Sequence, residues 1–184
     1  DIGAVDTDGT VGTRGFDGTA DTLSYAADAA SQDAVKVGEA MTDTFSYTGG
    51  DEHGGTDTAT VTVTVTGVND APDAVEDTSS VSEDAVTGNL HGTLLLNDTD
   101  VDHDAVLDIQ SVNTAGTVGT VAFDGTADTL TYAADAASQD ALKVGETMTD
   151  TFSYTVVDEH GATDTATVTV TVTGVNDAPD AVDD

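Results

Sequence analysis

Four aspartates alternate with other residues in one short segment of the chain. They are Asp98, Asp100, Asp102 and Asp104, within residues 97–104. In a turn or loop this spacing can gather several carboxylate oxygens around one ion, and Ca²⁺ accepts about six to eight oxygen ligands in irregular geometry. The segment is not an EF-hand loop, because His103 stands where that loop needs Gly and Ile109 where it needs Glu. We therefore expect an irregular calcium-binding loop here.

Further oxygen donors lie near the ends of predicted strands. They are Asn69, Asp70, Glu83, Asp84 and Asp158. Mg²⁺ demands a stricter octahedron than such scattered donors suggest, and zinc sites usually use nitrogen or sulfur ligands. An acidic loop combined with the Asn69-Asp70 linker therefore favours Ca²⁺ as the cofactor.

Other catalytic or metal chemistry is poorly supported by the residues present. There is no cysteine, and no two of the four histidines lie at a ligand spacing, so His53, His91, His103 and His160 are interpreted as turn or surface residues. Acid pairs such as Glu83 and Asp84 could in principle serve a glycosidase. With acids this abundant such pairs arise by chance, and no tryptophan is present to form a sugar platform. We therefore expect a protein that is not an enzyme.

The charge of the chain excludes several classes of partner. There are 36 acidic and 3 basic residues, for a formal net charge of −33. Nucleic acid is excluded because nothing would neutralise its phosphates, and an anionic membrane surface would repel the chain. No apolar run approaches the length of about 18 residues that a membrane span needs. Such a charge opposes compaction unless salt or bound cations offset it.

The elements that must position these acids read as β-strands. Residues 166–173 alternate Ala or Val with Thr, as do residues 59–66, and this period of two predicts a sheet with one dry and one wet face. Further strands are expected at 74–81, 89–96, 106–113, 117–123, 129–132 and 148–157, and one helical turn within 133–141. About seven strands separated by Gly, Asn and Asp turns predict an all-β, immunoglobulin-like antiparallel β-sandwich.

The chain also repeats itself. Residues 1–77 and 108–184 are nearly identical, and so long a period indicates a tandem array of whole domains. We expect an incomplete repeat at 1–70 that lacks its first strands, a complete β-sandwich at 71–177, and at 178–184 the start of the next repeat or an exchanged strand. Linkers containing Pro72 and Pro179 interrupt the strand ladders, so neighbouring domains should be arranged end to end.

The open start of the first repeat has two interpretations. If residues 1–184 form a whole subunit, a strand from another chain could complete the first sandwich and build a filament. If they are a window on a longer array, upstream residues supply the missing strands. We favour the window.

Three segments carry a resemblance to a known family. They are residues 67–90, 95–107 and 152–179, with sequences GVNDAPDAVEDTSSVSEDAVTGNL, LLNDTDVDHDAVL and FSYTVVDEHGATDTATVTVTVTGVNDAP. The sequence resembles the cadherin-like VCBS repeats of giant bacterial surface adhesins, many of them type I-secreted proteins of the RTX type. The resemblance implies cadherin-like sandwiches in long arrays, with Ca²⁺ at or near the domain junctions.

The resemblance also implies roles for individual residues. Asp98, Asp100 and Asp102 match the acidic loop, Asn69 and Asp70 the linker, Glu83 the acid after the first strand, and Asp158 the acid of the D-x-x-G turn, as does Asp51 in the first copy. The first copy departs from the pattern with Gly49-Gly50 in place of Val156-Val157, and it has no counterpart of the acidic loop.

These observations predict a calcium-stiffened structural spacer of an extracellular adhesin or surface fibre, secreted and held at the bacterial cell surface. The alternatives are an adhesion module that binds carbohydrate or protein, or a filament subunit assembled by strand complementation. Partners would be neighbouring repeats or identical subunits, and in the adhesion alternative surface glycans or proteins. The near-identity of the two copies favours the spacer, since recognition domains need individual loops.

Overall fold

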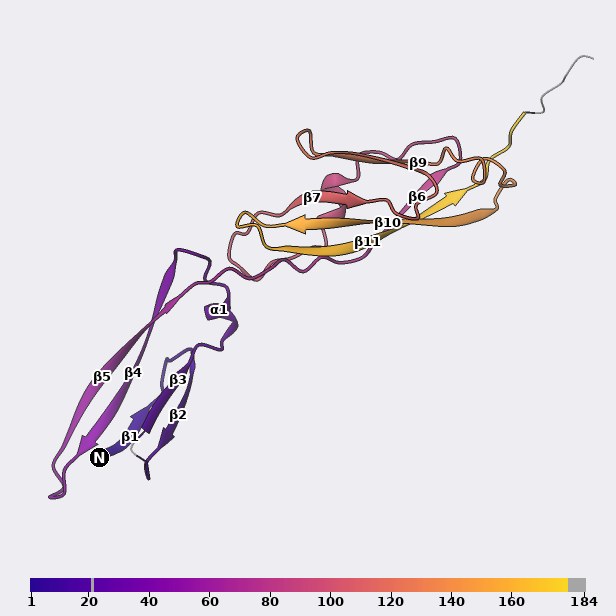
Figure 1. Cartoon of the computed structure of the whole chain (residues 1–184). Helices are drawn as coiled ribbons and strands as arrows, with labels where there is room; N and C mark the ends of the chain where they lie inside the picture. The colour runs from indigo at the N-terminus through magenta and orange to yellow at the C-terminus, as the bar shows by residue number, and fades with distance from the viewer. Residues whose placement is uncertain (21, 179–184) are drawn as a thin grey trace, which may run out of the picture. The chain divides into compact units, whose positions relative to one another are not determined.

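The computed structural model describes residues 1–20 and 22–178, in which the regular elements are β-strands apart from two short helices. The chain divides into two compact units (Figure 1). Unit 1 comprises Asp1–Asp70 and Val101–Ala105, and unit 2 comprises Ala71–Asp100 and the residues from Val106 onwards. The all-β fold class is confirmed, whereas the end-to-end arrangement of repeats remains a prediction. The expected next repeat or exchanged strand at 178–184 lies, apart from residue 178, outside the described residues.

Unit 2 is built around a four-stranded sheet. Its strands are β6 (Asp77–Ser82), β11 (Thr163–Thr173), β10 (Thr147–Val157) and β7 (Asp108–Asn113), in that spatial order. A separate hairpin joins β8 (Thr120–Asp124) to β9 (Thr129–Ala133). Figure 1 shows this hairpin lying over one face of the sheet, and residues of both layers share one hydrophobic core.

Strand β6 is the exception to antiparallel pairing in unit 2. It pairs in parallel with β11, from Asp77 opposite Val168 to Ser82 opposite Thr173. The pairs β10–β11, β10–β7 and β8–β9 are antiparallel. The first and the last strand of the unit therefore run side by side in the same direction.

One expected strand is wrong. Residues 89–96 contain the helix α2 (His91–Leu94) instead of a strand. The Leu94 amide donates to the Leu90 carbonyl over 2.9 Å, and this turn directs both leucines into the core, where they are 2% and 9% exposed. Leucines four residues apart lie on one face of a helix, and that spacing serves burial here better than the alternation of a strand.

The alternating strand β11 forms the centre of the core. Val168, Val170 and Val172 are fully buried, and the intervening threonines face the other side. They contact a cluster that includes Leu94, Ile109, Leu130, Tyr132, Phe152 and Tyr154. The predicted dry and wet faces of this strand are therefore confirmed.

Unit 1 repeats part of this plan. Its sheet has the order β1 (Ile2–Asp6), β4 (Ala40–Gly50), β5 (Thr56–Thr66), and a hairpin joins β2 (Thr13–Asp17) to β3 (Thr22–Ala26), followed by the helix α1 (Ala30–Asp33). Val61, Val63 and Val65 of β5 are only half-buried, although their sequence is that of β11. Among the described residues of unit 1, no strand or helix corresponds to β6 and α2, so part of this apolar face stays uncovered.

Candidate metal centre

The side chain of Asp98 is buried at the end of unit 2 where β6 begins. Its Oδ1 accepts a hydrogen bond from the Val75 amide at 2.7 Å, and the Tyr154 hydroxyl lies 3.1 Å from its Oδ2. The same hydroxyl donates to Asp77 Oδ2 over 2.8 Å. Two carboxylates from different elements therefore share one donor. A single hydroxyl proton cannot satisfy both acids fully.

The acids at this end repel one another. Burial raises the pKa of Asp98, and the charges of Asp164 and Asp73 raise it further against the hydrogen bonds that it accepts. Burial likewise raises the pKa of Asp77, and the charge of Asp98 adds to the effect. Such shifts mean that the ionised carboxylates are under-compensated by protein groups. A divalent cation would offset this repulsion.

Asp150, another buried aspartate, shows what a fully compensated acid looks like in this fold. Burial acts to raise its pKa, but hydrogen bonds from Tyr132 and from backbone amides, including those of Gly119 and Val118, outweigh burial and lower it. The counterpart in unit 1, Asp43, is held in the same way by Tyr25 and the Gly12 amide. Asp150 and Asp43 therefore have a structural role, whereas Asp98 and Asp77 lack enough hydrogen bonds to outweigh burial.

Asp158 lies at the same end of unit 2 as Asp98. It follows directly on the last residue of β10 and is 6% exposed. Its Oδ1 accepts hydrogen bonds from the amides of His160 and Ala162, so it closes the β10–β11 turn. Asp100 is half-buried and is the last residue of the acidic loop that belongs to unit 2.

The linker donors belong to unit 1. The Asp70 amide donates to Asp102 Oδ2 over 3.0 Å, and the Asn69 side-chain amide donates to the Asp70 carbonyl over 2.6 Å. The loop residue His103 is held by a 3.1 Å hydrogen bond from its amide to the Ala34 carbonyl. The structure therefore brings three of the predicted site residues together in unit 1: Asn69, Asp70 and Asp102.

Glu83 is not part of either group. It follows the far end of β6, and because that strand rises about 3.3 Å per residue, Glu83 lies about 20 Å from Asp77 along the strand. Its Oε1 accepts a hydrogen bond from the Val175 amide at 2.5 Å. Its Oε2 is buried and has no hydrogen-bond partner among the described residues. Glu83 thus serves the second linker, which starts after β11, and not the acidic loop.

Additional acids surround that second linker. A hydrogen bond with Asp140 is the main cause that raises the pKa of Asp84, with burial and the charges of Asp177 and Glu83 contributing as well. Asp177 repeats the linker position of Asp70, and Asp140 that of Asp33, which lines one small cavity with Asp70 in unit 1. Sequence reasoning missed Asp140, and it also missed Asp73, Asp77 and Asp164. Asp73 lies in the repeated linker and could have been found there, whereas Asp77, Asp140 and Asp164 had no signal beyond being acidic.

The donor chemistry of these groups fits calcium. Every candidate side chain in the three groups, around Asp98, Asp70 and Glu83, offers carboxylate or amide oxygen. The Glu83 Oε2 atom and the repelling pair Asp77 and Asp98 both lack sufficient positive partners. Hard divalent cations prefer such oxygens, and Ca²⁺ tolerates mixed carboxylate and carbonyl shells. Because Glu83 and Asp98 lie at opposite ends of unit 2, one ion could not bind both of them.

Several solved structures are similar to this chain at low identity and low TM-score. Mouse clustered PcdhgC3 EC1-3 is 16% identical, with coverage of 95% of this chain and 56% of that chain and a TM-score of 0.42. Protocadherin Gamma B7 extracellular cadherin domains 1-4 is 12% identical, with coverage of 96% and 42% and a TM-score of 0.43. Drosophila N-cadherin EC1-4 is 15% identical, with coverage of 73% and 33% and a TM-score of 0.41. The chain spans less than two thirds of each of these structures.

No match to the sequence was found among curated proteins. No helix in the described part of the chain is both long and apolar enough to cross a membrane. The model of the bacterial cadherin-like domain matches residues 69–174, more than half of the chain. The chain belongs to the bacterial cadherin-like domain family.

Proposed function

We propose that this chain is a calcium-stiffened structural spacer from an extracellular bacterial adhesin or surface fibre. Membership of a cadherin-like family supports an extracellular adhesion or structural role and gives no support to an enzymatic one. The observation that carries the calcium assignment is the pair of under-compensated carboxylates, Asp77 and Asp98, which share one tyrosine hydroxyl at a domain end. A chain with 36 acidic and 3 basic residues can supply few cations of its own.

The residues that would hold calcium fall on both sides of the unit boundary in sequence. Asp98, Asp100 and Asp158 belong to unit 2, and Asn69, Asp70 and Asp102 belong to unit 1. The chain passes from one unit to the other next to Asp70 and next to Asp100. Bound calcium would supply charge neutralisation and would restrain these chain crossings. Glu83 would do the same at the linker that follows β11.

The spacer role is favoured over recognition by the repeated sequence itself. The β10–β11 hairpin and the linker recur almost unchanged in the first copy, as strands β4 and β5 and residues 67–73. Repeats that differ little present the same surface at each position, which suits a fibre of uniform units. An adhesion module that reads a sugar or a protein would need loops of its own.

A calcium titration of thermal unfolding tests the proposal. Extracellular modules bind Ca²⁺ with dissociation constants of about 10⁻⁴–10⁻³ M, so millimolar calcium should raise the melting temperature above that in chelator. Asp98→Asn should require roughly tenfold more calcium for the same stabilisation, since a carboxylate ligand is replaced with a neutral carbonyl. If chelator leaves the melting temperature of the parent chain unchanged, the calcium assignment is wrong.

A matched control separates ligand loss from loss of charge. Asp57→Asn removes one negative charge from unit 1, at an exposed position whose side chain accepts a hydrogen bond from the Thr58 amide. This variant should keep the parent titration. Small-angle scattering with and without calcium then measures stiffness, and specific binding to a glycan array would favour the adhesion alternative over the spacer.

A further inference from the structure

His91 is the one histidine of this chain that is buried in the structure, although sequence reasoning treated it as isolated. It opens α2, and its side chain is 7% exposed. The imidazole stacks on Phe123, with ring centroids 6.5 Å apart and planes inclined by 6°. Packing against an aromatic ring holds the imidazole in one orientation. Its nitrogens therefore have fixed directions before any ligand arrives.

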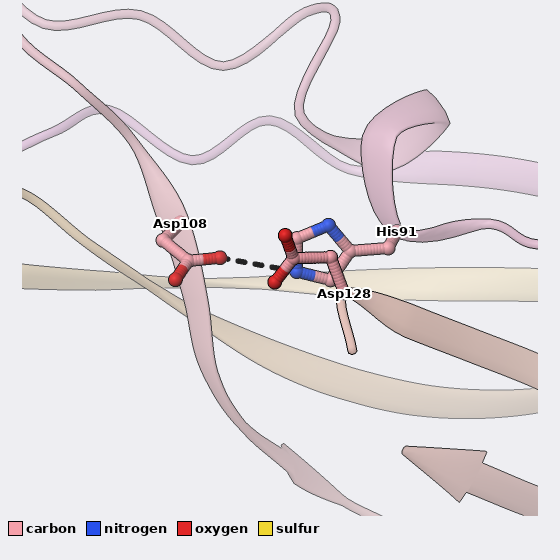
Figure 2. Close-up of side chains that lie close together, drawn as sticks. All are labelled: His91, Asp108 and Asp128. Carbon is pink, nitrogen blue, oxygen red and sulfur yellow. Dashed lines mark ion pairs between the residues drawn. The ribbon is translucent and has the colours of Figure 1, made fainter. Parts of the chain in front are cut away.

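Two carboxylates face this imidazole (Figure 2). Asp108 opens β7, and Asp128 precedes β9 in the β8–β9 turn. One nitrogen of His91 and one oxygen of each aspartate all lie within 4.8 Å of one another. The three side chains come from three separate elements of unit 2, and they share no residue with the calcium donors described above.

The buried nitrogen of His91 lacks a hydrogen bond. Nε2 lies 3.1 Å from Asp108 Oδ1, yet the direction of approach does not make a hydrogen bond, and Nε2 has no such partner elsewhere among the described residues. Burying a polar atom without a hydrogen bond costs free energy of folding, so the position of this nitrogen needs an explanation. His91 Nε2 and Asp108 Oδ1 lie close together without a hydrogen bond, as two ligand atoms of one metal ion would.

Asn89 connects two of the three segments that carry these side chains, namely α2 with His91 and the β8–β9 turn with Asp128. Its Oδ1 accepts hydrogen bonds from the His91 amide at 3.1 Å and the Leu130 amide at 2.9 Å, and its Nδ2 donates to the Asp128 carbonyl over 2.8 Å. Asp128 itself has a φ of 50°, in the left-handed region. The short turn is thereby held beside α2 with its carboxylate directed toward the histidine. Supporting contacts of this kind orient ligands in metal sites.

We propose that His91, Asp108 and Asp128 form a binding site for a zinc-type divalent transition metal ion. One imidazole nitrogen and two carboxylate oxygens are a ligand set for Zn²⁺, whereas Ca²⁺ takes oxygen. With Zn–N and Zn–O bonds of about 2.0–2.2 Å, two ligands of a tetrahedral ion lie about 3.3 Å apart. The 3.1 Å separation of His91 and Asp108 is close to this value. The exposed Asp128 turns slightly to complete the set, and water takes the fourth position.

The test is a titration with Zn²⁺ in the presence of millimolar Ca²⁺, which occupies the oxygen sites of this acidic chain. Imidazole ¹⁵N chemical shifts of the intact chain report which histidine binds and through which nitrogen. We expect the Nε2 resonance of His91 to shift at substoichiometric zinc, while the exposed His53 and His103 respond only at higher concentrations. Cobalt(II) should give the intense visible absorption of a tetrahedral centre.

Substitutions test which side chains bind the metal ion. Asp128→Asn changes an exposed side chain and should weaken zinc binding at least about tenfold. His91→Phe removes both nitrogens but keeps a ring to stack on Phe123, so it should fold and lose the site. Asp135→Asn, a charge-matched change at another exposed aspartate of unit 2, should leave the affinity unchanged. If Asp128→Asn and His91→Phe bind zinc like the parent chain, or if the His91 resonance does not move, His91 and Asp108 form a structural ion pair and the proposal fails.

Discussion

Replacement of Tyr154 with phenylalanine removes one hydroxyl group from the buried end of unit 2. Tyr154 is fully buried, and its hydroxyl lies 2.8 Å from Asp77 and 3.1 Å from Asp98. Phenylalanine fills the same space, so the change is confined to the hydrogen bonds. The hydrogen bond from Tyr154 lowers the pKa of Asp77 and that of Asp98 against the effect of burial. Without it, both acids are still less well compensated.

The size of the effect follows from these contacts. Hydrogen bonds to charged groups contribute about 1.5–3 kcal/mol, and losing the donor between the buried Asp98 and the half-buried Asp77 should destabilise unit 2 by that amount. For a domain of this size, 1 kcal/mol corresponds to about 4–8 °C in melting temperature, so the expected decrease is roughly 6–24 °C. The measurement is thermal and urea unfolding in chelator, with hydrogen exchange of β10 and β11 to assign the transition to unit 2.

The repeat supplies the control. Tyr47 occupies the same sequence position in unit 1, but it is half-buried and its hydroxyl makes no hydrogen bond to any described residue. Tyr47→Phe should therefore change stability by less than about 0.5 kcal/mol. Equal effects of the two substitutions would refute the reasoning, because the local sequence and not the carboxylate pair would then set the cost. A loss below about 0.5 kcal/mol for Tyr154→Phe would refute it as well.

Two further predictions concern pH and packing. The pKa values of Asp77 and Asp98 are raised in the folded state, so the folded state binds more protons than the unfolded chain. In chelator, stability should therefore increase as pH falls from 7 toward 5 and approaches the raised pKa values from above. Calcium should reverse that trend, since protons then compete with the ion for the carboxylates. A pH series of thermal melts with and without calcium measures both trends, and parallel profiles would contradict the calcium assignment. Val170→Ala should cost about 2 kcal/mol because Val170 is fully buried, whereas Val63→Ala, at the same position of the half-buried copy, should cost well under half of that. Urea unfolding of the two variants tests this difference, and equal costs would show that the two strands are equally packed.

The candidate site shows where sequence reasoning reaches its limit. The types of donor and their positions near strand ends could be predicted, because acids at alternate positions and a repeated Asn-Asp linker are visible in the chain. Which acids share a site could not. Glu83 and Asp98 are near in sequence, yet β6 carries Glu83 about 20 Å away to the second linker. His91 likewise had no ligand spacing, because Asp108 and Asp128 reach it only through the pairing of other elements.

The alternation of residue types along the chain specifies most of the strands, their two faces and the composition of the donor set, although residues 89–96 contain α2 instead of a strand. Alternating Val and Thr specify a strand whatever lies around it, since side chains point to opposite faces in turn. How deeply each copy of that strand is buried depends on the elements that pack over it. Identical segments in β5 and β11 differ in burial because β6 and α2 cover the second and not the first. The burial of a side chain depends on the residues that pack against it, and these are distant in sequence. The same long-range packing decides which carboxylates repel one another and could therefore hold an ion.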